Sequence, residues 1–303
     1  MADKKEKMRT LLSALIVMAL WGSLFPFIKI GYAAFSIDTA SVADILMFAA
    51  LRFTVCGAIV CGIAAIKKEP VQQPRAKSVT MITLMGVFAI VLHYACTYVG
   101  LSMTDSSKTA LLKQLGVLLY VCFAFLFFKD ETFRVGKLIG ALVGFGGIIA
   151  INAGGGTIRF TLGDVLIILA SVCTVVSNVM SKKSVEGNSP FWVTGISQLT
   201  GGLILLAIGF AMGGRLPVFT WQAALVFGSI CTASIVSYTL WYAVQRRADL
   251  SGLFIIKFAE PLFACAFGAI LLGEDIFKWQ YLAAFVLISG GIVIANLQSK
   301  KSA

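Results

Sequence analysis

The sequence predicts an all-α polytopic membrane protein, with ten transmembrane helices arranged as two five-helix repeats of opposite orientation. Three observations support this prediction: an apolar composition, ten apolar segments of membrane-spanning length, and a similarity between the two halves of the chain. Of the 303 residues, 59% are hydrophobic and 13% are charged, whereas soluble domains are roughly 45–50% apolar and about 25% charged. This composition excludes a soluble enzyme, a disordered chain and a fibrous protein.

Polar or turn-forming segments such as Glu69-Pro70 and Lys129–Glu131 separate the apolar runs. Each run has about 20 residues, which matches the roughly 30 Å hydrocarbon core of a bilayer. Backbone polar groups in lipid must be bonded within the segment, so we expect each run to form a helix. The predicted spans are 10–32, 43–66, 79–101, 107–128, 135–153, 162–181, 191–213, 222–245, 249–272 and 277–297.

Basic residues are distributed unevenly among the loops that these spans define. With the N-terminus inside the cell, most Lys and Arg residues fall in cytoplasmic segments, as the positive-inside rule requires. The rule predicts that both termini are cytoplasmic and that the protein lies in the cell (inner or plasma) membrane. The formal net charge of +11 is then explained by topology, and no nucleic-acid partner is expected.

The two halves of the chain are similar, because Tyr94–Asn152 aligns without a gap onto Tyr238–Asn296. Some identical pairs are polar and are not explained by a shared lipid-facing composition: Asp105/Asp249, Ser107/Ser251 and Lys113/Lys257. We assign residues 1–153 to the first five-helix repeat and 154–303 to the second, within one transport domain. Five is an odd number of spans, so the second repeat must enter the membrane in the opposite sense.

Inverted repeats are frequent in secondary transporters, whose substrate site lies near the bilayer midplane between the repeats. The alternative is a duplication retained in a channel or a structural protein. The sequence contains no Walker A motif, which argues against ATP-driven transport by this chain alone. Its single histidine, and cysteines that all lie in apolar runs, give no basis for a metal site or another cofactor.

Three segments resemble the EamA group of the drug/metabolite transporter superfamily: Ala19–Lys29, Ala259–Leu262 followed by Leu271–Glu274, and the first-half counterpart Leu126–Glu131. The resemblance implies ten helices in two inverted repeats and the transport of amino acids, other metabolites, nucleotide sugars, sugar phosphates or drugs. In the sugar-phosphate translocators of this superfamily, lysines on the corresponding helices are implied to hold phosphate. The halves differ at one point, where Gly116-Val117 stand opposite Glu260-Pro261.

Lys113 and Lys257 occupy matched positions in the two halves. At about 1.5 Å per residue, positions about eight residues into their spans place them roughly 12 Å deep. A lysine at a helix centre costs about 2.5–3.5 kcal/mol on insertion scales. Two matched cations that face one cavity would attract a carboxylate or a phosphate. The alternative is that each lysine pairs locally and only fixes the packing.

Glu260 is the only acidic residue well inside a span, and it follows Lys257 by three positions on the same helix face. It either neutralises Lys257 or takes up a proton and couples it to substrate release. Pro261 removes a backbone donor and lets the helix bend, which gives it a gating or packing role. His93 is a second candidate proton carrier, with a packing role as the alternative.

An aromatic set lies on the third and eighth spans: Tyr94, Tyr98, Tyr238, Trp241 and Tyr242. Several of these residues are too deep for an interfacial belt. We therefore expect them to line a cavity and contact an organic substrate, together with Trp21 and Asn178. Arg52 and Gln198 occupy matched mid-span sites and either close a gate or orient the bundle.

These features predict a secondary transporter, an exporter of amino acids or other small carboxylate-bearing or anionic metabolites, that works by alternating access. The expected partners are the substrate, the lipid bilayer and, as a candidate coupling ion, the proton; we expect a monomer, with a dimer as the alternative. One alternative function is proton-coupled efflux of cationic drugs, although buried lysines outnumber buried acids. Another is an intramembrane enzyme, which no Ser/Lys or paired-Asp constellation supports.

Overall fold

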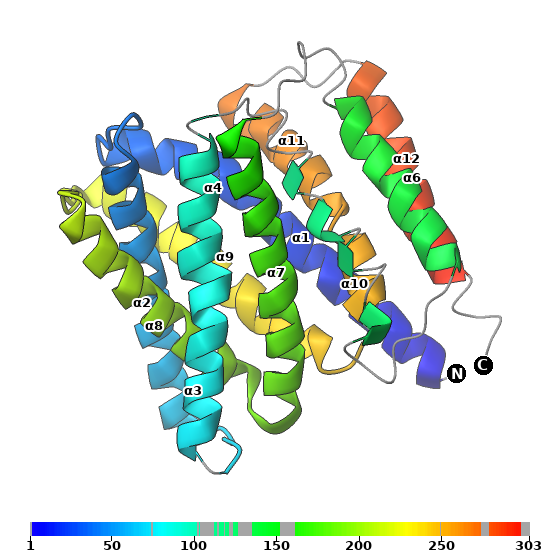
Figure 1. Cartoon of the computed structure of the whole chain (residues 1–303), viewed down its shortest axis with the longest axis horizontal. Coiled ribbons are helices and arrows are strands. Elements are labelled where there is room, and N and C mark those ends of the chain that lie inside the picture. Colours follow the sequence, from blue (N-terminus) through cyan, green and yellow to red (C-terminus); the bar gives the residue numbers. More distant parts are fainter. Residues whose placement is uncertain are drawn as a thin grey trace.

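The computed structural model describes residues 2–73, 75–101, 103, 112–113, 115–117, 119–120, 124–126, 135–151, 161–248, 250–273 and 279–297. The regular structure of these residues is helical (Figure 1). Seven helices are long and apolar enough to cross a membrane: Met8–Ala34, Val42–Ile66, Arg75–Gly100, Leu162–Gly187, Pro190–Ala211, Trp221–Gln245 and Gly252–Leu272. Two shorter apolar helices cover Val135–Gly147 and Leu282–Ile294. The protein is therefore an all-helical, polytopic membrane protein.

The first half of the chain contains α1 (Ala2–Ala34), α2 (Val42–Ile66), α3 (Arg75–Gly86), a π-helical segment η1 (Val87–Leu92), α4 (His93–Leu101), a short 3₁₀ turn η2 (Ala124–Leu126) and α6 (Val135–Ile151). Helix α2 begins after Ser41, whose hydroxyl accepts a hydrogen bond from the backbone N–H of Asp44 at 3.2 Å. This side-chain cap satisfies a backbone donor that the first turn leaves free. Segments α3, η1 and α4 follow one another directly and together form the third long span.

The second half contains α7 (Leu162–Gly187), α8 (Pro190–Ala211), α9 (Trp221–Gln245), α10 (Leu250–Ile256), α11 (Ala259–Leu272) and α12 (Trp279–Leu297). Helix α7 begins with a capping box, in which the side chains of Thr161 and Asp164 each bond to the backbone of the other residue. Helix α11 ends at Gly273, which has a φ of +67°. Glycine adopts this left-handed conformation without the steric penalty of a Cβ atom.

Two pairs of helices pack closely along their lengths, α2 against α8 and α6 against α12 (Figure 1). A Cβ atom on Gly57 of α2 would collide with the backbone of Leu199 in α8. In the other pair, a Cβ atom on Gly291 of α12 would lie 2.5 Å from the carbonyl oxygen of Gly140 in α6. Small residues thus allow close backbone approach. Inside a bilayer the hydrophobic effect does not drive helices together, so association depends on such close packing.

Seven of the predicted spans coincide with the seven long apolar helices, and the predicted spans 135–153 and 277–297 overlap α6 and α12. The predicted span 107–128 lies mostly outside the described residues. Helix α7 runs six residues beyond the predicted end at 181, because hydropathy marks the edge of the lipid rather than the end of the helix. The ninth span consists of two helices, α10 and α11, that meet at a turn over Lys257 and Phe258.

Candidate functional site

Aromatic rings from four helices form a continuous series of contacts through the bundle. We call this set the aromatic series; it comprises Tyr98, Tyr94, Phe53, Tyr238, Trp21 and Trp241. Successive ring centroids in that order are 5.8, 5.0, 6.3, 5.5 and 5.2 Å apart. These separations lie within the range in which aromatic pairs attract each other.

The aromatic series joins residues from both halves of the chain. Tyr94 and Tyr98 come from α4, whereas Tyr238 and Trp241 come from α9. Tyr242, one turn beyond Tyr238 on α9, has its ring 6.3 Å from the ring of Tyr238 and is buried. The structure therefore brings together all five tyrosine and tryptophan residues that the sequence singles out on the third and eighth spans.

Lys257 lies at the turn between α10 and α11, and Pro261 explains why the helix changes there. Proline has no N–H with which to bond the carbonyl four residues earlier, which in this case is the carbonyl of Lys257. That carbonyl accepts instead from the N–H of Glu260 at 3.0 Å. The tightened turn separates the two helices and places Lys257 at their junction.

The ammonium group of Lys257 is surrounded by three aromatic rings. Its Nζ atom lies 5.2 Å from the ring centroid of Trp21, 5.5 Å from that of Trp241 and 5.3 Å from that of Phe254. A cation within about 6 Å of a ring centroid is attracted by the negative face of the ring. The lysine therefore lies at the Trp21–Trp241 end of the aromatic series, where ring faces surround its ammonium group.

Two other charged groups lie close to Lys257. The charges of Lys113 and Glu260 both interact with its ammonium group, and Glu260 also interacts with Lys113. The backbone around Lys113 is fixed to α7, because the hydroxyl of Ser171 donates to the carbonyl oxygens of Leu112 at 2.9 Å and of Lys113 at 3.1 Å. The two lysines that the sequence matches across the repeats thus lie within electrostatic range of each other and of the Glu260 carboxylate.

Arg52 is buried beside Tyr94 and Phe53 of the aromatic series, with 3% of its surface exposed. Its Nη2 atom donates a hydrogen bond to the hydroxyl of Tyr94 at 3.1 Å, and its guanidinium carbon lies 4.2 Å above the ring of Phe53. Its Nε atom is buried without a hydrogen-bond partner among the described residues. The sequence suggested a gate or a packing role for Arg52; the structure places this residue inside the aromatic series.

A polar network joins α7 to α9 beside the Lys257 rings. The Oδ1 atom of Asn178 accepts hydrogen bonds from Trp241 Nε1 at 3.0 Å and from Gln245 Nε2 at 2.8 Å. The Oε1 atom of Gln245 accepts in turn from the hydroxyl of Ser181 at 2.7 Å. Asn178 therefore fixes the orientation of one ring that contacts Lys257, which gives this residue a positioning role.

His93 follows the π-helical segment η1 and faces α7. Its Nδ1 atom lies 3.0 Å from the hydroxyl of Thr174 and 3.2 Å from the carbonyl oxygen of Ala170. Its ring contacts the ring of Tyr94 at 5.2 Å. Single π-helical turns inside helices occur frequently at functional sites. This one ends at Leu92, directly before His93 and Tyr94.

Gln198 on α8 is fully buried, and neither of its side-chain polar atoms has a hydrogen-bond partner within the described part of the chain.

The sequence analysis missed Phe53, Phe254, Ser181 and Gln245, which complete the contacts described above. Gln245 could have been noticed as a polar residue at a span end, whereas the two phenylalanines look like ordinary lipid-facing residues. Among the described residues, no group of three or more His, Cys, Asp or Glu side chains is placed to hold a metal ion.

Comparison with known proteins identifies the family. The model of the EamA-like transporter family matches the chain twice, over residues 8–153 and 161–296. The chain belongs to the EamA-like transporter family. It is therefore a multi-pass membrane transporter, and a transporter implies a small-molecule substrate.

Similar proteins from several organisms carry transporter names. The uncharacterized transporter YvbV of Bacillus subtilis is 25% identical over 300 residues, which cover 97% of this chain and 93% of YvbV. The uncharacterized inner membrane transporter YedA of Escherichia coli K12 is 22% identical over 278 residues, with 91% and 87% covered. One solved crystal structure has the same fold, with a TM-score of 0.77 at 20% identity over 97% of this chain and 98% of the other.

Proposed function

We propose that this transporter exports small organic metabolites that carry a carboxylate or another anionic group, amino acids among them, by alternating access. The main support is the balance of charge along the aromatic series, where Arg52, Lys113 and Lys257 are accompanied, within the described part of the chain, by the carboxylate of Glu260. Basic groups inside a membrane are expensive and are usually paired or functional. An anionic substrate would supply the missing negative charge, and the rings would contact its organic part.

The substrate would bind at the Lys257 end of the aromatic series. There three ring faces surround the ammonium group, and its N–H donors would turn to a substrate carboxylate. Glu260 would balance one lysine when the site is empty. In the proposed coupling step, Glu260 takes up a proton and later releases it. If a proton gradient does not drive substrate transport, the transport mode is exchange or facilitated diffusion.

Ten helices in two inverted repeats, residues 1–153 and 154–303, are the proposed architecture. The helix pairings support it: α1 packs against α9, and α7 packs against α4, so the first span of each half contacts the third span of the other. The second spans, α2 and α8, and the fifth spans, α6 and α12, also pair with each other. Such reciprocal pairing is what a pseudo-two-fold axis in the membrane plane produces.

Cytoplasmic termini and a location in the cell (inner or plasma) membrane complete the proposal. The loop after α2 and the loop after α7 meet, since Ser189 N–H donates to the Pro70 carbonyl at 3.0 Å and Gln72 N–H donates to Asn188 Oδ1 at 2.9 Å. Basic residues Lys67, Lys68, Lys182 and Lys183 flank these loops, which supports a cytoplasmic position under the positive-inside rule. A monomer is sufficient, because one chain supplies the whole aromatic series.

A thermal-shift screen of metabolites on the purified protein tests this proposal. We expect carboxylate-bearing ligands to raise the melting temperature of the wild type, and Lys113→Gln and Lys257→Gln to abolish that rise. Lys77→Gln, which changes an exposed lysine near the start of α3, is the matched control and should retain it. Hits that survive in both Lys113→Gln and Lys257→Gln would contradict the proposed site.

Efflux of cationic compounds is a second candidate, because the three rings around Lys257 form the kind of cage that holds organic cations. In that case the lysine itself occupies the cage and must leave it before a substrate enters. Lys257→Gln would then strengthen cation binding instead of weakening anion binding. The same thermal-shift screen separates the two candidates by the charge of the ligands that respond.

A further inference from the structure

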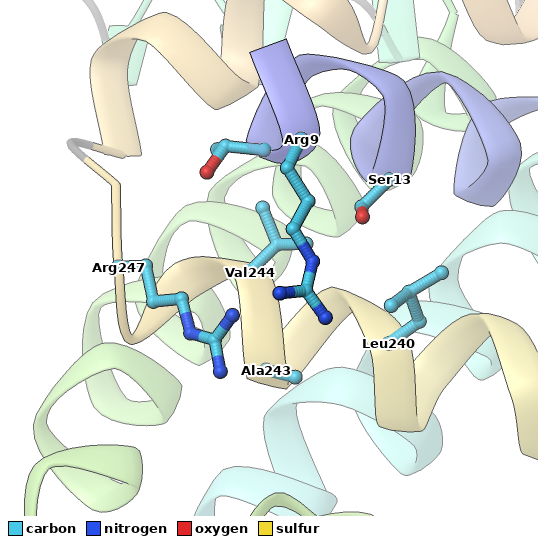
Figure 2. A pocket seen from close by; sticks show the side chains of 7 residues that line it. Arg9, Ser13, Leu240, Ala243, Val244 and Arg247 are labelled. Atoms are coloured by element: carbon cyan, nitrogen blue, oxygen red, sulfur yellow. The ribbon is translucent and has the colours of Figure 1, made fainter. Parts of the chain in front are cut away.

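A small pocket opens between the start of α1 and the end of α9. It has a volume of about 180 Å³ and is lined by Arg9, Thr10, Ser13, Leu240, Ala243, Val244 and Arg247. Figure 2 shows the side chains of Arg9 and Arg247 reaching from opposite walls toward one another over α9. None of the seven lining residues is acidic, so the pocket combines two cations and two hydroxyls with an apolar wall.

The two arginines lie close to the ends of their membrane spans. The first membrane span begins at Met8 and the span of α9 ends at Gln245, so Arg9 and Arg247 lie within two residues of the span ends. Both side chains are exposed. Guanidinium groups present parallel N–H donors that fit two oxygens of one phosphate.

Apolar side chains continue the pocket along both helices into the span. On α1, Leu12 and Ile16 follow Arg9 at helical spacing, and each is 53% exposed. On α9, Val236 precedes Leu240 by one turn and is 45% exposed. Residues three and four apart share a helix face, so each wall of the pocket is basic at one end and apolar toward the span. A phospholipid has the matching order, with a phosphate followed by acyl chains.

We propose that this pocket binds a phosphate-bearing anion, namely the headgroup of an anionic phospholipid whose acyl chain follows the apolar residues of α1 and α9. Two guanidinium groups without a carboxylate in the pocket lining disfavour each other, and a phosphodiester between them relieves that repulsion. The hydroxyls of Thr10 and Ser13 are further donors for the phosphate or its glycerol. Free inorganic phosphate shares the charge but has nothing to place against Leu240 and Val244.

Native mass spectrometry of the full chain in detergent tests this site with defined lipids. Phosphatidylglycerol is titrated against phosphatidylcholine on the wild type and on the double variant Arg9→Gln/Arg247→Gln. We expect a bound phosphatidylglycerol on the wild type, and a loss in affinity of about a hundredfold in the double variant, because it removes two charge-assisted contacts that contribute roughly tenfold each. The control Lys77→Gln/Arg246→Gln removes two exposed charges from the same end of the bundle and should bind as the wild type does.

A second variant and a second ligand sharpen the result. Arg9→Lys/Arg247→Lys keeps both charges but loses the paired donors, and we expect intermediate affinity from a chain that remains folded. In a separate arm, inorganic phosphate is added without lipid. If inorganic phosphate binds and its binding depends on the two arginines, the occupant is a soluble phosphate ligand and the lipid proposal is contradicted. Equal phosphatidylglycerol binding by the wild type, the Gln double variant and the control would overturn the site.

Discussion

Replacing Asn178 by alanine tests whether the network between α7 and α9 holds the rings that surround Lys257. In the wild type, Asn178 Oδ1 accepts from Trp241 at 3.0 Å and from Gln245 at 2.8 Å. Asn178→Ala leaves both donors without this acceptor, whereas Gln245 keeps its bond from the Ser181 hydroxyl. The perturbation therefore leaves two buried donors, Trp241 Nε1 and Gln245 Nε2, without this acceptor.

The expected magnitude follows from burial and from hydrogen-bond energies inside membranes. Trp241 is 2% exposed and Asn178 is 8% exposed, so water cannot easily replace the lost acceptor. A buried donor left unsatisfied costs about 1–3 kcal/mol, while single interhelical hydrogen bonds in a bilayer average about 0.6 kcal/mol and reach about 1.7 kcal/mol. We expect Asn178→Ala to lower the free energy of unfolding by about 1–3 kcal/mol.

A double-mutant cycle isolates the pair. Trp241→Phe removes the N–H but keeps a ring, and unfolding of each variant in mixed micelles is followed by circular dichroism. We expect the two changes to be non-additive by about 0.6–1.7 kcal/mol. The control Ser229→Ala removes an exposed hydroxyl on α9 that bonds only to its own helix and should change stability by less than about 0.5 kcal/mol. Strictly additive effects of Asn178→Ala and Trp241→Phe would refute the coupling.

Three further predictions follow from the packing and the buried polar groups. Gly57→Ala should destabilise the protein by about 1–3 kcal/mol by overpacking. Gly62→Ala on the same helix adds a Cβ atom that meets nothing within 4 Å and should be neutral or stabilising in thermal unfolding; equal effects of the two substitutions would contradict the close contact of α2 with α8. Tyr94→Phe should lower stability by about 1–3 kcal/mol because Arg52 loses its hydrogen-bond acceptor, and an unchanged denaturation midpoint would show that this bond contributes nothing. Pro261→Ala restores a backbone donor and should slow transport while thermal stability is kept or raised; an unchanged flux rate in proteoliposomes would remove the turn from the mechanism.

Much of the fold was predictable, because the bilayer sets a fixed length for apolar helices and forbids unpaired backbone groups. The seven long helices fall where hydropathy places them. Two local features were not predictable from hydropathy: the π-helical segment Val87–Leu92, and the position of the turn at Lys257 and Phe258. Both depend on which carbonyl each N–H selects, and apolar composition carries no information about that choice.

The candidate site was predictable where the two halves repeat each other. Matched positions drew attention to Lys113 and Lys257 and to the tyrosine pairs, and the structure places these residues in one region. The contact of Arg52 with Tyr94 was not predictable, since it depends on how α2 rotates against α4. The same holds for Phe53, whose ring links Tyr94 to Tyr238 although it resembles any other apolar residue of a span.

The central claim is that Lys113 and Lys257 attract an anionic substrate beside the aromatic series. Its most direct test is the flux of radiolabelled amino acids, organic acids and organic cations in proteoliposomes that contain the wild type, Lys113→Gln, Lys257→Gln or the exposed-lysine control Lys77→Gln. We predict saturable flux of a carboxylate-bearing solute that the wild type and the control share and that the Lys113→Gln and Lys257→Gln variants lose. Flux of organic cations alone, unchanged in both of these variants, would contradict the claim.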